Sequence, residues 1–384
     1  MRISIPIDRW DPNRGGAERY LARLSAELGA RGHEVTVLCC EALAEQPGSS
    51  GARIEALPVP HFPRWLRELR FAQAAVRAHR ASGRDVLFQV RHALQADVYQ
   101  PHGGSLLASR RAQGLALPAW RRWARDLAAA LRPSHHVLRS LDRAVFQSGR
   151  RPVVLSVSGK VEEDFRRTYP EIDFRFERLP NPVDTEHFHD RDREVCRAAL
   201  RAQYGFLARD RVALFAAHHF GPKGLHCALS ALALDGDWRL VVAGRDETKP
   251  FQRFAARLGV LDRVRFAGPV GDLRAFHAAA DAFVLPTYYD ACSLGVLESL
   301  ACGTPPITTR LNGASELLVH GRNGFVLDRP DDPARLAQAL GEAASRPGIR
   351  EACRQAASEL SWERHVERLE KILFQVTGSK LGCA

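Results

Sequence analysis

Residues 281–300 of this chain read DAFVLPTYYDACSLGVLESL. The apolar run 282–285 predicts a short buried strand, and the small residues before Val296 predict a tight turn into a helix. The first main-chain N–H groups of a helix have no partner within it, and the helix dipole is positive at that end. The turn can therefore hold an anion, and a phosphate is the obvious candidate.

Two carboxylates flank this turn. Asp290 precedes it, and Glu298 follows about two helical turns later. Both can accept hydrogen bonds from hydroxyl groups on either side of a bound phosphate, which is the pattern that a nucleotide sugar presents. The alternative is a helix that simply starts with an Asp cap and carries a surface Glu.

Short apolar strands alternate with helices along the rest of the chain. The opening residues predict a strand at 2–7, a loop at 8–16, a helix at 17–30 and a second strand at 35–38. Further strands are expected at 85–90, 153–157, 212–217, 238–243, 264–266 and 306–309. This alternation predicts an α/β protein with two doubly wound, Rossmann-like parallel-sheet domains that meet near residues 180–210 and face a central cleft.

Length and composition agree with this class. A chain of 384 residues is too long for one ordinary core, and 45% hydrophobic with 26% charged residues is typical of globular proteins. No run of about 18 apolar residues occurs and the N-terminus lacks a signal-peptide pattern, so we expect a cytoplasmic protein. The eight cysteines include no C-x-x-C pair and are expected to be reduced thiols.

Positive charge is concentrated in residues 61–151, here called the basic stretch. It contains 17 Arg, no Lys and five acidic residues, a net charge of +12, whereas the whole chain carries +11. Arg alternates with Trp and Leu in it, as around Trp120 and Trp123. Such a face could contact an anionic membrane, an acidic acceptor or nucleic-acid phosphates, or it could be a solvated helix surface. No zinc finger, RRM or KH signature accompanies it, so no nucleic-acid partner is expected.

The acidic pair resembles the E-x7-E region of retaining glycosyltransferases of family 4, which have the GT-B fold. Further motifs similar to that family follow one another in the right order over nearly the whole chain. They are Gly15-Gly16-Ala17-Glu18-Arg19, Asn181-Pro182-Val183-Asp184 with Phe188, Lys223-Gly224, and the segments 301–309 and 312–317 after the pair. Within the family, the chain is most similar to lipopolysaccharide core glucosyltransferases, through Asp97-Val98-Tyr99, residues 146–149 and residues 220–224.

The resemblance implies a role for each matching residue. Glu298 would hold the ribose hydroxyls of the donor, and Asp290 the hydroxyls of its sugar. Lys223 would pair with the diphosphate, and His102 would hydrogen-bond the donor sugar or the developing charge. The donor site would be completed by main-chain groups of Gly15, Gly16, Ser293, Leu294 and Gly295.

Three positions depart from the family's usual pattern. The first acid of the pair is Asp290 rather than Glu, and Ser293 stands where Gly is usual. His218 occupies the place of a basic partner of Lys223. Donor affinity would then be lower, unless Arg19 or Arg245 compensates.

The implied activity is the retaining, metal-independent transfer of a hexose from a nucleoside-diphosphate sugar. Uridine diphosphate glucose is the expected donor, and the acceptor would be a glycan or glycolipid such as lipopolysaccharide core, at the cytoplasmic membrane face. Residues 1–185 would form the acceptor domain and 186–360 the donor domain, with a C-terminal helix at 361–384 packing back on the first. No cofactor or metal is expected, since the two D-x-D strings, Asp190–Asp192 and Asp235–Asp237, flank a helix start and a turn.

Two other functions would use parts of the same sequence. A nucleotide-sugar epimerase of GT-B fold would use a related cleft without an acceptor. An RNA-binding protein would instead use the basic stretch. A nicotinamide dehydrogenase and a P-loop enzyme are disfavoured because G-x-G-x-x-G and G-x-x-x-x-G-K-[ST] are both missing.

Overall fold

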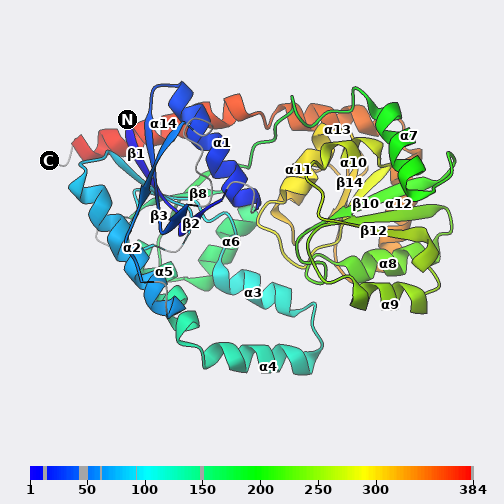
Figure 1. Ribbon diagram of the computed structural model, residues 1–384, viewed down its shortest axis with the longest axis horizontal. Helices are drawn as coiled ribbons and strands as arrows, with labels where there is room; N and C mark the ends of the chain where they lie inside the picture. Colours follow the sequence, from blue (N-terminus) through cyan, green and yellow to red (C-terminus); the bar gives the residue numbers. More distant parts are fainter. Residues whose placement is uncertain (12–14, 43–50, 61–62, 92, 148–150, 382–384) are drawn as a thin grey trace. The chain divides into compact units, whose positions relative to one another are not determined.

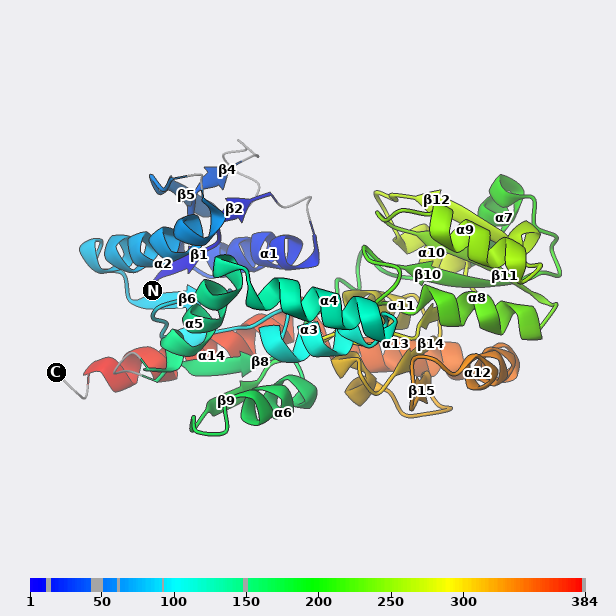
Figure 2. The same ribbon diagram turned by 90° about the horizontal axis from the view of Figure 1, so that it is seen from below.

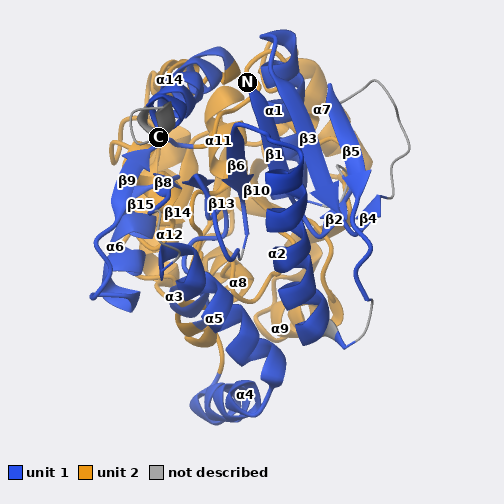
Figure 3. Ribbon diagram, turned by 90° about the vertical axis from the view of Figure 1, so that its left-hand side faces the viewer, with its two compact units in different colours: residues 1–110, 118–180, 363–384 blue, residues 111–117, 181–362 orange. Residues whose placement is uncertain are grey.

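The computed structural model describes residues 1–11, 15–42, 51–60, 63–91, 93–147 and 151–381. They form two compact units, coloured separately in Figure 3. Unit 1 comprises Met1–Arg110, Pro118–Pro180 and Glu363–Ala384, and unit 2 comprises Arg111–Leu117 and Asn181–Trp362. Residues 12–14 of the expected loop, and Ser148 and Gly149 of the glucosyltransferase-like motif, lie outside the described residues.

Unit 1 is built on a parallel sheet. Its described strands follow the order β5-β3-β1-β6-β7-β8-β9, so the strand order reverses between β1 and β6. They are β1 (Arg2–Pro6), β3 (Glu34–Cys39), β5 (Ala52–Ala56), β6 (Val86–Gln89), β7 (Val98–Tyr99), β8 (Val153–Ser156) and β9 (Arg175–Arg178). The short strands β2 (Arg9–Trp10) and β4 (Glu41–Ala42) pair separately.

Helices cover both faces of this sheet. In Figure 1, α1 and α14 lie on one face, and α2 and α5 on the other. The helices with residues in unit 1 are α1 (Gly16–Ala30), α2 (Arg64–Ala81), α3 (Leu106–Gly114), α4 (Ala119–Ala130), α5 (Pro133–Gln147), α6 (Gly159–Thr168) and α14 (Trp362–Leu381). Phe71 and Ala75 of α2 pack on Leu38 and Leu57, which anchors this helix to the sheet.

Unit 2 repeats the design. Its parallel strands follow the order β12-β11-β10-β13-β14-β15 and reverse between β10 and β13. They are β10 (Arg211–Ala216), β11 (Trp238–Ala243), β12 (Val264–Gly268), β13 (Ala282–Leu285), β14 (Pro306–Thr309) and β15 (Phe325–Leu327). The two sheets confirm the predicted α/β class with two Rossmann-like domains.

The helices of unit 2 also form two layers. Helices α7, α10, α11 and α13 cover one face of the sheet, and α8, α9 and α12 cover the other (Figures 1 and 2). They are α7 (Arg193–Tyr204), α8 (Leu225–Leu234), α9 (Lys249–Arg257), α10 (Arg274–Ala279), α11 (Leu294–Ala301), α12 (Pro333–Ser345) and α13 (Ile349–Ser358), with 3₁₀ turns η1 (Leu261–Arg263) and η2 (Gly313–Leu317).

A buried polar contact joins the first and last helices of the chain within unit 1. The hydroxyl of Tyr20 in α1 lies 2.8 Å from Nε2 of His365 in α14, whose Nδ1 lies 3.0 Å from the carbonyl oxygen of Pro180. The ring of His102 packs edge-on against Tyr20, with 4.3 Å between centroids. Burial lowers the pKa of His365 to about 4, and burial with the nearby charges of His365 and Arg91 lowers the pKa of His102 to about 3.

We expect the free energy of unfolding to decrease as the pH is lowered from about 7 to about 5. Unfolded histidines take up a proton near pH 6.5, whereas folded His102 and His365 stay neutral until their lowered pKa values are reached. Each of the two histidines can therefore lower the free energy of unfolding by up to about 2 kcal/mol at pH 5. Urea unfolding across this range should show a shallower pH dependence in His365→Gln, and an unchanged one in His136→Gln at an exposed position. Equal dependence in all three proteins would contradict this account.

Candidate functional site

Two of the predicted site residues meet at the carboxyl edge of the unit 2 sheet. Lys223 follows β10, and Asp290 follows the neighbouring strand β13. Lys223 Nζ donates to Asp290 Oδ2 at 2.5 Å and to the carbonyl oxygen of Tyr289 at 3.1 Å. Lys223, predicted to bind the diphosphate, is therefore paired with Asp290, predicted to bind the sugar. Since β10 and β13 flank the reversal of strand order, the pair stands where open α/β sheets bind ligands.

Gly224 explains why a glycine follows this lysine. Its φ of +85° lies in the left-handed region, and a Cβ there would stand 2.0 Å from the carbonyl oxygen of Pro286. Only a glycine lets the start of α8 approach the loop after β13 this closely. The contact brings Lys223 to Asp290, so the K-G motif is a packing requirement as well as a source of charge.

The turn into α11 is held by a buried asparagine. Asn312 Oδ1 accepts the main-chain N–H of Ser293 at 3.2 Å and that of Ala314 at 3.1 Å, and its Nδ2 donates to Thr308 Oγ1 at 3.0 Å. The amide of Ser293, expected to face a diphosphate, is thus already engaged, and its role stays a prediction.

The next two amides of the turn are open. Across the described chain, the N–H groups of Leu294 and Gly295 have no hydrogen-bond acceptor. Leu294 is the first residue of α11, so both groups point out of the end of a helix where the dipole is positive. These amides can bind an anion directly.

A second asparagine supports the same turn from the other side. Asn181 Nδ2 donates to the carbonyl oxygen of Cys292 at 3.1 Å, and both residues are buried. Burial, aided by the negative charge of Asp290, raises the pKa of the Cys292 thiol to about 12. Neither Asn181 nor Asn312 was expected to hold this turn, although each belongs to a segment singled out by the resemblance.

Glu298 lies in the second turn of α11 and is buried. Its Oε2 stands 3.8 Å from Nε2 of His277 in α10, a ring that is also buried and whose two nitrogens have no hydrogen-bond partner among the described residues. A buried carboxylate needs hydrogen-bond donors, which ribose hydroxyls would supply. That ligand stays a prediction for Glu298.

The remaining predicted residues belong to unit 1. Gly15 caps α1 and Gly16 is its first residue, while His102 follows β7 and contacts Tyr20 one turn into α1. The His102 imidazole is neutral at physiological pH, because its pKa is lowered to about 3 by burial and nearby positive charge. It can therefore exchange hydrogen bonds with a ligand but does not supply a positive charge.

A cavity of about 370 Å³ opens beside these residues in unit 1. Its lining includes Gly103 and Gly104, next to His102, together with Asp8 after β1 and Arg91 after β6. Arg91 Nη1 lies 3.3 Å from Asp8 Oδ1, and Arg91 Nη2 lies 3.0 Å from Glu18 Oε1. Asp8 and Arg91 were not predicted from the sequence. Their position directly after the two strands that flank the reversal is the signal that could have found them.

The D-x-D acids are engaged by other groups. Asp192 forms a two-point pair with Arg274 at 2.6 and 3.0 Å, and Asp190 pairs with Arg354 at 2.5 Å. Asp235 Oδ1 accepts the main-chain N–H of Asp237 in a turn. Within the described ranges, no three His, Cys, Asp or Glu side chains gather as metal ligands. Metal independence stays a prediction.

Comparison with known proteins decides the family. Residues 14–187 match the family described as Glycosyltransferase Family 4, and residues 197–360 match Glycosyl transferases group 1. The chain is a family 4 glycosyltransferase. The family expected from the sequence motifs is thereby confirmed.

Relatives and solved structures agree with this family. Lipopolysaccharide glucosyltransferase WaaG of Escherichia coli K12 is 24% identical over 355 residues, which cover 88% of each chain. D-inositol 3-phosphate glycosyltransferase of Streptomyces scabiei is 34% identical over 169 residues, 40% of this chain and 38% of that one. The crystal structure of WaaG superposes with a TM-score of 0.79 at 22% identity, over 97% of this chain and 99% of that one.

The WaaG superposition confirms the predicted GT-B fold for this family 4 glycosyltransferase. Anabaena HepE, solved with UDP and glucose, superposes with a TM-score of 0.72 at 18% identity, over 97% of this chain and 98% of that one. Among the described helices, none combines the length and apolar character needed to cross a bilayer.

The close approach at Gly224 gives a direct test of the site. Gly224→Ala adds a methyl group that collides with the Pro286 carbonyl, and should remove about 3 kcal/mol or more of stability together with UDP-glucose binding. Gly205→Ala is the matched control, since Gly205 has a φ of +69° but open space around its Cβ, and should cost only about 1 kcal/mol. Calorimetric unfolding and donor titration measure both effects. Similar losses in the two variants would show that the Pro286 contact is unimportant.

Proposed function

We propose that this family 4 glycosyltransferase moves glucose from uridine diphosphate glucose to a glycan or glycolipid acceptor such as lipopolysaccharide core. The observation that carries the proposal is the Lys223–Asp290 pair beside the open amides of Leu294 and Gly295. A cation and a helix N-terminus stabilise a leaving diphosphate, and the carboxylate can accept hydrogen bonds from the sugar. WaaG is a lipopolysaccharide glucosyltransferase and HepE was solved with UDP and glucose, and both similarities support this choice of substrates.

In the proposed reaction, the bond between the anomeric carbon and the phosphate oxygen breaks first. Lys223 and the α11 amides take up the negative charge that develops on the diphosphate. The acceptor hydroxyl attacks from the same face and gives its proton to the departing phosphate, which retains the anomeric configuration. Positive charge from Lys223 and the helix end makes a bound metal unnecessary, so the rate should be insensitive to a chelator.

We place acceptor binding in unit 1 and donor binding in unit 2. The 370 Å³ cavity of unit 1 has the carboxylate of Asp8 and the guanidinium of Arg91 in its wall, groups that can bind sugar hydroxyls. His102 lies beside Gly103 of that wall and would hydrogen-bond the transferred sugar.

Substitution at the donor site tests the activity. Lys223→Ala and Glu298→Ala should each lower UDP release from UDP-glucose in the presence of acceptor about a hundredfold or more. Lys249→Ala, which removes an exposed lysine of the same unit, should leave the rate unchanged. A wild-type rate in folded Lys223→Ala would refute the assignment.

The same assay separates transfer from isomerisation. Nuclear magnetic resonance of the products should show a new α-glycosidic bond and free UDP. Conversion of UDP-glucose into another UDP-hexose without acceptor would instead identify an epimerase. Release of UDP that stops when EDTA is added would contradict metal independence.

An exposed apolar stripe on α4 supports binding of the chain to a membrane surface. Trp120, Trp123, Leu127 and Leu131 recur at helical spacing along α4 and its C-cap, with exposed fractions of 67%, 68%, 47% and 75%. Figures 1 and 3 show α4 beyond α5, on the side away from the sheet of unit 1. Arginines such as Arg121 and Arg122 belong to the same helix. A helix with exposed Trp and Leu beside Arg can lie in the surface of an anionic bilayer.

We expect the chain to sediment with phosphatidylglycerol vesicles through α4. Trp120→Ser with Trp123→Ser should weaken the partition about tenfold or more, because two large apolar side chains no longer enter the lipid. Val195→Ser with Leu207→Ser, exposed apolar positions of unit 2, is the matched control and should bind as the wild type does. Binding indifferent to salt or to Arg121→Glu would count against an electrostatic contribution.

A further inference from the structure

A second concave site lies at the amino edge of the unit 2 sheet. A cavity of about 290 Å³ is bordered by Arg211 at the start of β10, by Asp281 before β13 and by Pro305 before β14. Arginines from α7, from the start of β10 and from the last two helices of the unit converge on it. They are Arg193, Arg197, Arg209, Arg211, Arg346 and Arg350. We call this cavity the arginine pocket.

The cations of the arginine pocket outnumber the acids. Asp281 is the only carboxylate in the described lining, and it is shared by Arg193 at 3.2 Å, by Arg197, and by the neighbouring Arg201 at 3.0 Å. Asp210, which separates Arg209 from Arg211, instead pairs with Arg239 at 3.2 Å. The pocket therefore carries a strong excess of positive charge.

Two of the arginines are left without any partner. Within the described structure, the side chains of Arg209 and Arg211 make no hydrogen bond or ion pair. Among the described residues, the Arg346 side chain pairs only with Glu342, at 3.5 Å. These guanidinium groups are available to a ligand that enters from solvent, since Arg209 and Arg346 are exposed and Arg211 is half-buried.

Arg350 lines the pocket and, among the described residues, forms no ion pair with a carboxylate. Its Nη atoms lie 3.4 Å from the carbonyl oxygens of Ala280 and Cys302 and from Thr304 Oγ1, and its buried Nε has no partner in the described chain. Burial and the neighbouring charge of Arg193 lower the pKa of this guanidinium to about 10. An anion in the pocket would offset the repulsion between Arg193 and Arg350. It could also accept a hydrogen bond from the unpartnered Arg350 Nε.

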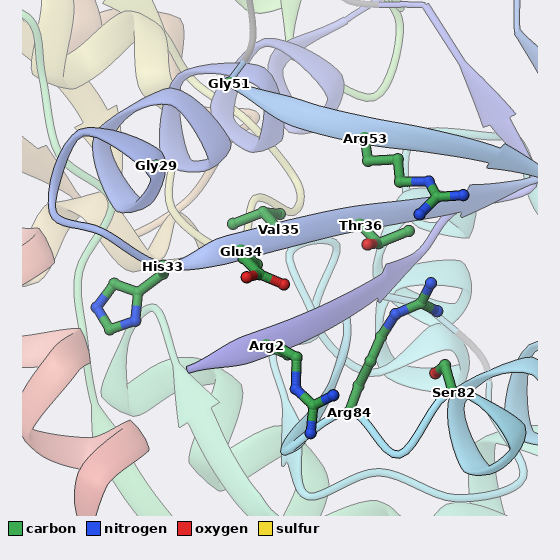
Figure 4. A pocket seen from close by; sticks show the side chains of 10 residues that line it. All are labelled: Arg2, Gly29, His33, Glu34, Val35, Thr36, Gly51, Arg53, Ser82 and Arg84. Atoms are coloured by element: carbon green, nitrogen blue, oxygen red, sulfur yellow. The ribbon is translucent and has the colours of Figure 1, made fainter.

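The comparable cavity of unit 1 lacks this imbalance. Figure 4 shows Arg2, Arg53 and Arg84 around a space of about 610 Å³ at the amino edge of that sheet. Arg2 lies 3.7 Å from Asp85, and Arg84 lies 2.7 Å from Glu55. Glu34 adds a carboxylate to the wall. Its cations are therefore largely balanced by carboxylates.

We propose that the arginine pocket binds a small, multiply charged phosphate-bearing anion, such as pyrophosphate or a phosphomonoester. Guanidinium groups match phosphate oxygens in two-point hydrogen bonds, and several unpaired ones converge here on a space the size of a small molecule. The pocket is separate from the donor site, because the six-residue strand β10, about 20 Å long, has Arg211 at its start and Lys223 beyond its end. The proposal does not depend on the proposed transfer activity.

Calorimetric titration with pyrophosphate in physiological salt tests the proposal. The full chain carrying Lys223→Ala is used as the parent, so that pyrophosphate binds the candidate donor site more weakly. We expect the parent to bind pyrophosphate. Arg209→Gln with Arg211→Gln should weaken that binding about tenfold or more, since two guanidinium groups that would donate charged hydrogen bonds are lost.

A matched control removes the same charge elsewhere in unit 2. Arg253→Gln with Arg322→Gln, both at exposed positions, should change the affinity for pyrophosphate less than about twofold, because physiological salt screens distant charges. Unaltered binding after loss of Arg209 and Arg211, an equal loss in the control, or no binding of any phosphate titrant by the parent would each overturn the proposal.

A second titrant separates the two sources of phosphate. Glucose 6-phosphate presents a phosphomonoester on a sugar, whereas pyrophosphate is a free inorganic anion. Binding of either one that depends on Arg209 and Arg211 supports the pocket, and the tighter of the two identifies the source. A ligand that binds the folded state raises the unfolding temperature. Whichever titrant binds the pocket should therefore raise Tm only while both Arg209 and Arg211 are present.

Discussion

Lys223 and Asp290 are 67 residues apart in sequence, yet their charged atoms lie 2.5 Å apart, because the chain leaves neighbouring parallel strands at the same edge of one sheet. The strand order reverses between β10 and β13, and open α/β sheets bind ligands at such a reversal. Gly224 then lets the loop after β10 contact the loop after β13. The geometry of the candidate donor site thus rests on a backbone contact that no larger residue could make.

The polar groups around that contact have two roles: some hold the turn before α11 in place, and others are free to bind a ligand. The side chains of Asn312 and Asn181 form hydrogen bonds with the turn before α11, and these bonds fix the direction of the helix. The amides of Leu294 and Gly295 stay open as a consequence of this support. A site that must stabilise charge without rearrangement needs such a fixed frame, because donors that are already oriented lose nothing when the charge develops.

Much of the fold follows from the sequence for one physical reason. Strands in the middle of a parallel sheet are buried on both faces and are therefore continuous apolar runs, as at β1, β10 and β13. Strands β5, β9 and β15, which lie at sheet edges, were not predicted, since an edge strand such as β9 (RFER) carries charges that hide it.

The candidate site was predictable to a smaller extent. The spacing of Asp290 and Glu298 within one turn and one helix is a local property, and so it could be read directly. Support by Asn181, 111 residues before Cys292, depends on the tertiary fold and could not. The arginine pocket was hidden for a related reason. It draws on distant segments in a part of the chain whose net charge is close to zero, so only the fold reveals the local excess.

The burial of Cys292 under the turn before α11 has a practical consequence. A thiol reacts with alkylating reagents through its ionised form, and burial both shields this sulfur and keeps it protonated. Modification of Cys292 therefore requires the turn to open first, and its rate reports how often that happens. The chain thus contains its own chemical probe of motion at the candidate donor site, with no label to introduce.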